Sequence, residues 1–534
     1  MSYSPKTHIG AQKKSQVVLI IGIVIVFNVL ISSVSIRADL TEEKLFTLSD
    51  ATKTVLQNAP NTVTIKAFIS KKIPDALLAT RQDFKDLLNE YENAGGENVI
   101  IEYLDPDENE RNKTQADKYG IQQIRFNTFG AEKFEITSGY FGMAILYEDK
   151  SENFPVLQQT ENLEYDITST IQKMSRKKTP VIGLISGHGE KIDPAERAEI
   201  EKQYIVQEIL AQELENSSDG IDLALIVGPT QAIPPEDLYS VDQFAMSGKP
   251  VIILANGTTV DLQFFTATAL NTGLNTLLEE YGIKINSDVA IDTLSNEALQ
   301  FSSGIFSFAL PYSAWPVITE NGVNPDSPIT SALRKLTFPW PSTLSIREDT
   351  GAATITPLFV TSPQSYSAQG QPIQLNPEAL EARLPPEKSA KILGAHITGP
   401  LTSAFSGKEI PSRASEGETN SIINTGFIPS TESSNIIVVG SNNFLDPSVV
   451  QRSFDNFILL GNALDVMTTG QSLADIRSRG SQIRPIKILS KEQERTIKYG
   501  NIFSGVVIAV LVGFISTFRR RKKDRYAQNI YSDI

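Results

Sequence analysis

The residues with the clearest chemical potential lie in one short loop, Ser186-Gly-His-Gly-Glu190. His188 and Glu190 could form a proton switch or a set of hydrogen bonds to a ligand, and Gly187 and Gly189 let the backbone approach that ligand closely. A structural role is the other interpretation: the glycines permit a tight exit from a strand, Glu190 begins a helix turn, and His188 satisfies a nearby carbonyl. The sequence leaves both interpretations open.

Catalysis at this loop is the less favoured chemistry. Ser186 lies only two residues from His188 and is not part of a Gly-x-Ser-x-Gly nucleophile elbow. His188 and Glu190 are two candidate ligands where zinc usually takes three or four. The chain has no cysteine, which excludes disulfides, thiolate metal sites and cysteine nucleophiles. We therefore predict no catalytic residue, no metal and no cofactor, with a hydrolase or metalloenzyme as the disfavoured alternative.

Two other polar stretches were candidates for binding. Asn442 and Asn443 follow an apolar run near the C-terminus and complete the predicted ligand-binding set. Asp105-Pro-Asp-Glu108 is acidic, but it lacks the glycine and the terminal glutamate of a calcium loop. A turn that caps the next helix is the favoured interpretation of that stretch.

The loop at His188 follows a run, 181–185, that has the length and composition of a buried parallel strand. In open α/β sheets, ligands bind at the carboxyl ends of the strands. Further buried strands alternate with helices, which predicts a doubly wound α/β domain over 180–470, with a β-rich elaboration at about 286–430. The predicted strands are 221–227, 251–254 and 435–440, and the predicted helices are 194–215, 235–246 and 456–467.

The N-terminal part of the chain predicts a smaller domain. Its order of strand, helix, strand, helix and hairpin is typical of a thioredoxin-like α/β domain, over 37–157. Without a Cys-x-x-Cys pair, thiol exchange is ruled out, so we expect a binding or spacer module. A helical connector, 158–179, leads into the larger domain.

Two uncharged runs, 17–36 and 502–518, predict transmembrane helices. A cleaved signal peptide is the alternative for the first run, but that run is longer than the usual apolar region of such a peptide. Basic tails, 1–16 and 519–534, flank the two runs, and 471–501 is the predicted juxtamembrane segment.

Charge sets the expected orientation. The chain has a net charge of −14, although its two terminal tails are basic. Basic flanks mark the cytoplasmic side. This predicts a two-pass protein of the inner (cytoplasmic) membrane with both termini cytoplasmic, a large periplasmic or extracellular domain and the lipid bilayer as a partner. The acidic middle excludes a nucleic-acid partner, which would need a basic surface.

Several short motifs, in their order along the chain, resemble one family. This is the auxiliary, GldG-type component of gliding-motility-associated ABC transport systems, a family related to the intraflagellar-transport domain. The motifs are Leu45-Phe-Thr-Leu-Ser49, Leu163-Glu-Tyr-Asp166, Ser186-Gly-His-Gly-Glu190, Ile226-Val-Gly-Pro229, Asn442-Asn443-Phe444 and the region 456–465.

The resemblance implies an extracytoplasmic domain working beside a separate ABC ATPase and a multi-span permease. It also implies that the sheet domain is similar to class I glutamine amidotransferases, although the amidotransferase cysteine has no counterpart here. The full expectation is an α/β chain with two transmembrane helices flanking a thioredoxin-like domain and a doubly wound, amidotransferase-like domain with a β-rich insertion.

Two functions follow from these expectations. The first is a non-catalytic, membrane-anchored auxiliary subunit of an ABC transport system, whose extracytoplasmic domain binds a partner or an exported substrate. The chain has no Gly-x-x-x-x-Gly-Lys-[Ser/Thr] motif, so it is not the ATPase, and two spans are too few for a permease. The alternative is a membrane-tethered enzyme or carbohydrate- or small-molecule-binding protein that uses the loop at His188.

Overall fold

The computed structural model describes residues 47–74, 77–129, 134–157, 162–216, 220–303, 306–348, 351–382, 385, 387–411 and 426–470, together with 473, 476, 495, 498, 499 and 513. The chain divides into two compact units, Met1–Ser481 and Gln482–Ile534. The elements described below all belong to the first unit.

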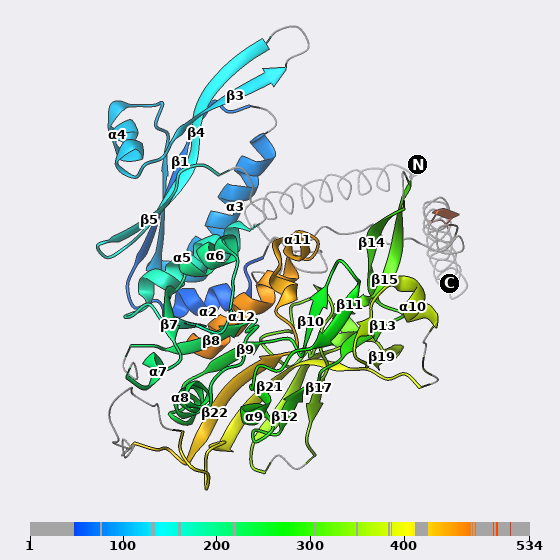
Figure 1. Ribbon diagram of the computed structural model, residues 1–534. Helices are drawn as coiled ribbons and strands as arrows, with labels where there is room; N and C mark the ends of the chain where they lie inside the picture. The colour runs from blue at the N-terminus through cyan, green and yellow to red at the C-terminus, as the bar shows by residue number, and fades with distance from the viewer. Residues whose placement is uncertain are drawn as a thin grey trace, which may run out of the picture. The chain divides into compact units, whose positions relative to one another are not determined.

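The N-terminal part is a five-stranded mixed sheet with helices (Figure 1). The strand order is β2-β1-β4-β3, with β5 paired to β4. Strands β1 and β2 run parallel, as expected for two strands joined through a helix, and β1 and β4 run antiparallel. The elements are α2 (Asp50–Asn58), β1 (Val63–Ile69), α3 (Leu78–Gly95), β2 (Val99–Leu104), α4 (Glu110–Lys118), β3 (Gln123–Phe129), β4 (Phe134–Tyr147), β5 (Lys150–Phe154) and α5 (Leu163–Ser175).

Two of the motifs that carried the family resemblance meet at the start of α2. The Ser49 hydroxyl caps this helix by accepting from the Thr52 backbone N–H. Glu164 on α5 accepts from the Ser49 backbone N–H and from the Thr52 hydroxyl, each at 2.7 Å. The two motifs therefore have a structural role, because they fasten α2 to α5.

The larger part is built on a nine-stranded sheet with the order β12-β17-β21-β22-β9-β8-β6-β7, and β18 also pairs with β21. Five neighbouring strands, β7, β6, β8, β9 and β22, are parallel. The parallel strands are β6 (Val181–Ser186), β7 (Ile205–Leu210), β8 (Leu223–Val227), β9 (Val251–Leu254) and β22 (Ser430–Val439). The remaining strands of the sheet are β12 (Ile283–Ile285), β17 (Leu344–Ile346), β18 (Thr354–Val360) and β21 (Ile392–Thr402).

Helices cover both faces of the parallel strands. Alternate strand residues enter different cores: Ile226 and Ile253 pack with α8, whereas Leu225 and Ile252 pack with α12. Both faces are apolar, as burial of a parallel sheet on both sides requires. The helices of this part are α6 (Pro194–Glu201), α7 (Glu213–Asn216), α8 (Pro235–Met246), α9 (Asn275–Leu278), α11 (Pro447–Val450) and α12 (Asp455–Thr469).

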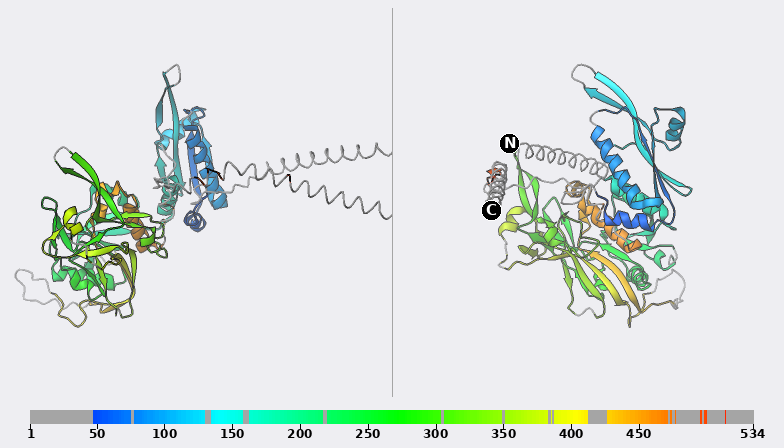
Figure 2. Two further views of the ribbon diagram at one scale, coloured as in Figure 1. Left: turned by 90° about the vertical axis from the view of Figure 1, so that its right-hand side faces the viewer. Right: turned by 180° about the vertical axis from the view of Figure 1, so that it is seen from behind.

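In the larger part, the strands outside the nine-stranded sheet begin before the predicted elaboration, at Thr258, and many of them pack around an apolar cluster that includes Tyr312, Ala314 and Tyr366. Figure 2 shows the hairpin of β14 and β15 rising from the larger part. The elements are β10 (Thr258–Asp261), β11 (Thr266–Ala269), β13 (Val289–Asp292), β14 (Asn296–Ser303), β15 (Phe306–Thr319), β16 (Lys335–Thr337), β19 (Ser365–Ala368), β20 (Ile373–Gln374) and α10 (Pro377–Ala382), with short 3-10 turns at Gly96–Asn98, Glu320–Gly322 and Asn443–Leu445.

The structure corrects the predicted membrane topology. No helix among the described residues is long and apolar enough to cross a bilayer. A span needs about 20 predominantly apolar residues, whereas α3, the longest of these helices, has 18 residues and includes charged side chains such as Arg81, Asp86 and Glu90. The described residues therefore form a mixed α/β fold with many strands and include neither of the two predicted transmembrane helices, so the predicted two-pass inner-membrane localisation is not supported. The predicted runs 17–36 and 502–518 lie outside the described residues, apart from Gly513.

The cap at α2 generates a prediction about stability. Glu164→Ala removes the acceptor for the Ser49 N–H and the Thr52 hydroxyl, so we expect a loss of about 1–3 kcal/mol in the free energy of unfolding. Glu164→Gln supplies an amide oxygen as an acceptor in the same place, so its free energy of unfolding should fall by less. Urea unfolding monitored by circular dichroism measures both. Equal stability of Glu164→Ala and the wild type would contradict the assigned role.

His396 on β21 generates a prediction about pH. Its Nε2 lies 2.6 Å from Oδ1 of Asn435 on β22. Burial lowers the pKa of His396 below its ordinary value, and the hydrogen bond to Asn435 opposes this change only in part. The folded state therefore binds fewer protons than the unfolded state, so the stability from a neutral His396 is complete above about pH 6.5 and is lost as the pH falls through the lower folded-state pKa.

The melting temperature should accordingly fall between about pH 7.5 and about pH 5.5. His396→Gln carries no titrating ring, so its melting temperature should depend less on pH across this window. Differential scanning calorimetry at several pH values measures the two slopes. Equal slopes for the two proteins would show that His396 does not contribute.

Candidate functional site

The loops that follow the parallel strands meet at one edge of the sheet. Strand β6 lies between β7 and β8. The chain therefore runs from β6 to β7 on one side and then crosses back to β8 on the other side. In doubly wound folds, this reversal of strand order opens a crevice where ligands bind. The loop at 186–190 leaves β6 at this point, and the loop at 228–231 leaves β8 beside it.

His188 lies between two carboxylates. Its Nδ1 is 3.1 Å from Oε1 of Glu190, and its Nε2 is 3.1 Å from Oδ2 of Asp237, in the first turn of α8. The histidine is only 7% exposed. A neutral imidazole has one N–H, so both contacts are hydrogen bonds only when the three groups share an additional proton. The ring is held at both nitrogens and neither is open to a substrate.

The backbone of the loop closes over the end of β8. The His188 carbonyl accepts from the backbone N–H groups of Thr230, at 3.0 Å, and Gln231, at 2.9 Å. Gly189 has a φ of +84°, and a Cβ there would lie 2.1 Å from the Thr230 hydroxyl. Glu190 Oε2 accepts from the His188 N–H at 2.7 Å. The loop therefore packs closely against the residues that follow β8, and glycine is required at position 189 for both conformation and space.

Ser186 is not arranged as a nucleophile. Its hydroxyl donates to the Ile209 carbonyl on β7 at 3.2 Å, and the His188 ring is engaged by Glu190 and Asp237. An activated serine would need a hydrogen bond to a general base. Gly187, with a φ of +114°, is the exposed residue of this loop.

Asn442 and Asn443 belong to a separate amide cluster at the same edge. The Asn256 side chain, just after β9, donates to Oδ1 of Asn442 at 2.6 Å and lies 3.4 Å from Oδ1 of Asn443. A Cβ on Gly228 would lie 2.3 Å from Nδ2 of Asn442, which places the cluster beside the end of β8. All three asparagines are partly exposed, so this cluster offers neutral donors and acceptors to an outside molecule.

Sequence reasoning missed four residues of this edge. Asp237 and Thr230 complete the surroundings of His188, and Asn256 completes the amide cluster. Glu196, in the first turn of α6, is buried with no hydrogen-bond partner for Oε2, and burial raises the pKa of its carboxyl. The position of Thr230 and Asn256 just after buried strands was an available signal; the pairing of Asp237 with His188, 49 residues apart, had none.

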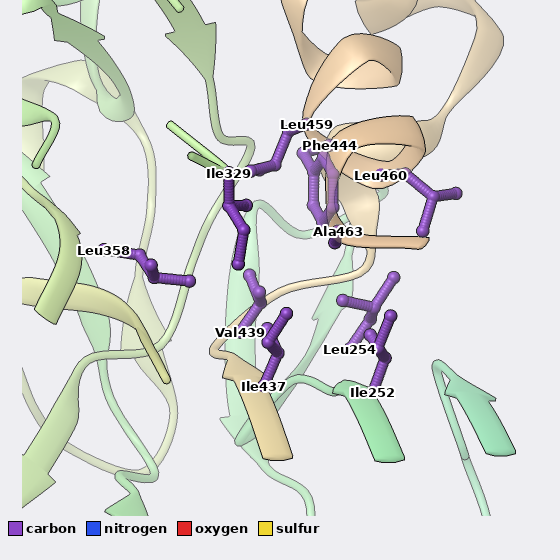
Figure 3. A pocket seen from close by; sticks show the side chains of 10 residues that line it. All are labelled: Ile252, Leu254, Ile329, Leu358, Ile437, Val439, Phe444, Leu459, Leu460 and Ala463. Carbon is purple, nitrogen blue, oxygen red and sulfur yellow. The ribbon is translucent and has the colours of Figure 1, made fainter. Parts of the chain in front are cut away.

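Two cavities elsewhere in the described part of the chain provide no better site. One of them, of about 10 Å³, lies between β9, β22 and α12, and Figure 3 shows the apolar side chains that line it, such as Leu254, Val439 and Leu460. A void this small and apolar is a packing defect. An open groove of about 590 Å³, bordered by Glu280, Arg347 and other residues, lies where β21 ends and β22 begins, away from the carboxyl ends of the parallel strands. No group of three or more histidine, aspartate and glutamate side chains in the described part of the chain is arranged to hold a metal ion.

The closed geometry generates a prediction for His188. His188→Ala leaves two carboxylates facing an emptied space, so we expect a loss of about 2–4 kcal/mol in the free energy of unfolding. Asn443→Ala, at the same edge but partly exposed and with longer hydrogen bonds, should lose less than about 1 kcal/mol. Chemical unfolding of the two variants gives the comparison. A fully stable His188→Ala would show that the loop is free to serve a ligand.

Comparison with known proteins supports the coarser part of the predicted family, an auxiliary component of an ABC transport system. A family model described as an ABC-type uncharacterized transport system matches residues 179–468, and a second model, described as a domain of unknown function, matches residues 42–146. An uncharacterized protein of Borreliella burgdorferi (strain ATCC 35210 / DSM 4680 / CIP 102532 / B31) is 25% identical over 504 residues, covering 91% of this chain and 94% of the relative.

Among solved structures, the mmIFT52 N-terminal domain is similar with a TM-score of 0.33 and 13% identity, over 55% of this chain and 98% of that chain. Likeness at this level does not establish a shared fold. The first family model covers more than half of the 534 residues. The chain therefore belongs to the family of ABC-type uncharacterized transport system proteins, which gives it an auxiliary role in such a system.

Proposed function

We propose that this chain is a non-catalytic, GldG-type auxiliary subunit that works beside a separate ABC ATPase and a multi-span permease. Membership of the ABC-type transport family supports the auxiliary role. The more specific GldG-type and gliding-motility assignment depends on the sequence motifs, two of which form the cap that joins α2 to α5.

The closed state of His188 is the observation that carries the non-catalytic part of the proposal. Both ring nitrogens contact carboxylate oxygens, and the ring is almost fully buried. A general base must reach the proton that it removes from a substrate, and this ring has no free nitrogen to do so. The three groups instead hold the loop after β6 against the start of α8.

The carboxyl edge of the parallel strands is the proposed binding surface for a partner or an exported substrate. Gly187, Thr230 and Gln231 are exposed along it, and Asn442 and Asn443 are partly exposed. These residues present neutral polar groups on a backbone that is held by hydrogen bonds. A rigid, already satisfied surface can bind another molecule with little cost in conformational entropy.

Affinity purification tests this proposal. The tagged full-length chain should recover both an ABC ATPase and a multi-span permease, identified by mass spectrometry. Gln231→Arg places a bulky charge on the proposed surface and should reduce recovery by about tenfold or more. Gln82→Arg makes the same substitution at an exposed position of α3 and should leave recovery unchanged.

The outcomes separate the two parts of the proposal. Absence of an ATPase and a permease from the wild-type sample would contradict the auxiliary role with these partners. Full recovery with Gln231→Arg would leave that role in place and remove the carboxyl edge as its contact surface.

A carbohydrate or another small polar molecule is the second candidate ligand. The amide cluster of Asn256, Asn442 and Asn443 favours it, because side-chain amides both donate to and accept from hydroxyl groups. An enzyme that uses the loop at His188 has no comparable support, since its ring nitrogens are already engaged.

A further inference from the structure

Glu196 is a buried carboxylate with one oxygen that makes no hydrogen bond. It lies in the first turn of α6 and is 6% exposed. Its Oε2 has no partner within the described part of the chain. Burial of a charged group without partners costs free energy, because the lost hydration is not replaced. A neutral side chain would avoid this cost, so stability alone does not account for a carboxylate at this position.

Packing of α6 brings Glu196 toward the loop that follows β22. Ile200, one turn further along α6, belongs to the apolar cluster that contains Phe444 and Leu445. Residues four apart lie on the same face of a helix, so Glu196 faces the same side of α6 as Ile200. Asp446 comes directly after Leu445 and caps α11. Glu196 therefore lies at the carboxyl edge of the parallel strands.

Two further carboxylates lie beside Glu196. Asp193, in the loop after β6, caps α6 three residues before Glu196. Burial, together with the negative charges of Asp193 and Asp446, raises the pKa of the Glu196 carboxyl. Asp193 is partly exposed and Asp446 is exposed. The cluster thus has one inner carboxylate, at Glu196, and two outer carboxylates on the solvent side.

The basic side chains of α6 and its C-cap have acidic partners outside this cluster. Arg197 pairs with Glu201 and Glu208, and Lys202 pairs with Glu199. These ion pairs use carboxylates other than those around Glu196. The negative charge at the end of the sheet is therefore suited to a cation from outside the chain.

An organic cation fits the cluster better than a metal ion does. The described residues include no group of three or more histidine, aspartate and glutamate side chains that is arranged to hold a metal ion. Calcium and magnesium take six or more oxygen ligands in a defined geometry. An ammonium or guanidinium group instead has several N–H donors and can meet carboxylates in a looser arrangement.

We propose that Glu196, Asp193 and Asp446 bind a lysine or arginine side chain of another protein. The identity of that protein rests on the proposed function, which places a partner or an exported substrate at the carboxyl edge. A long basic side chain that enters between the two outer carboxylates brings its cation to Glu196 and compensates the buried charge. This contact adds a charged anchor to the neutral amides of Asn442 and Asn443 at the same edge.

Binding of a tetralysine peptide to the purified full-length chain tests the site. Isothermal titration calorimetry at about 0.15 M salt measures the affinity while exposed charges are screened. The wild type should bind tetralysine about tenfold or more tightly than the same peptide with acetylated side chains, because acetylation removes the charge. Glu196→Gln should weaken tetralysine binding by about fivefold or more. Glu199→Gln, the matched control on the exposed side of α6, should bind as the wild type does.

The melting temperature separates binding from folding. Glu196→Gln carries no buried charge, so it should melt at or above the wild-type temperature although it binds tetralysine more weakly. Asp446→Asn keeps an oxygen that caps α11, and it should also bind more weakly with an unchanged melting temperature.

Three results would overturn the proposal. The first is equal tetralysine affinity of Glu196→Gln and the wild type. The second is equal affinity of the wild type for the charged and acetylated peptides. The third is weaker binding that comes with a lower melting temperature in both Glu196→Gln and Asp446→Asn, since the carboxylates would then act through the fold.

Recovery of the ATPase and the permease distinguishes this proposal from the proposed function. Recovery should fall with Glu196→Gln and stay at the wild-type level with Glu199→Gln. A wild type that recovers neither protein, but binds tetralysine through Glu196, would support the cation site and contradict the auxiliary role. Full recovery with Glu196→Gln would overturn the assignment of the bound side chain to these partners.

Discussion

The position of β6 in the middle of the parallel strands is the constraint on which the larger part of the structure depends. It pairs with β7 on one side and β8 on the other, and its residues enter the cores on both faces of the sheet. A strand buried in this way must be apolar throughout. Its polar side chains must therefore be concentrated where it ends, at Ser186 and the loop that follows.

This constraint explains why residues that could do chemistry are concentrated in the loop and contact one another there. The reversal of strand order beside β6 leaves a crevice that many α/β proteins use for ligands. Here the His188 carbonyl accepts from Thr230 and Gln231, and Glu190 and Asp237 contact the two ring nitrogens. A buried polar group needs such partners to avoid a large desolvation cost. The polar groups of this loop therefore stabilise the fold, whereas the partly exposed side-chain amides of Asn256, Asn442 and Asn443 can still contact another molecule.

The sequence predicted the elements whose patterns are local, and failed where long-range pairing decided the outcome. Strands β8 and β9 lie where continuous apolar runs placed them. The prediction of one helix over 194–215 is wrong, although the positions of Ile205, Val206, Ile209 and Leu210 also fit a helical spacing. In the structure this run is interrupted by β7, because these residues pair with β6. The loop at His188 could be located from its glycines, but the contact with Asp237 depends on how α8 packs and could not be read from spacing.

The structure shows the loop after β6 held closed by hydrogen bonds from its own residues and from the loop after β8. Hydrogen exchange of the full-length chain measures this directly. The backbone N–H of His188 donates to Glu190, and those of Thr230 and Gln231 donate to the His188 carbonyl. Peptides that contain these groups should therefore exchange slowly, on the timescale of β6 itself. Exchange as fast as that of an exposed turn would mean that the loop opens readily. The crevice would then be accessible to a ligand, and the structural role assigned to His188 would be wrong.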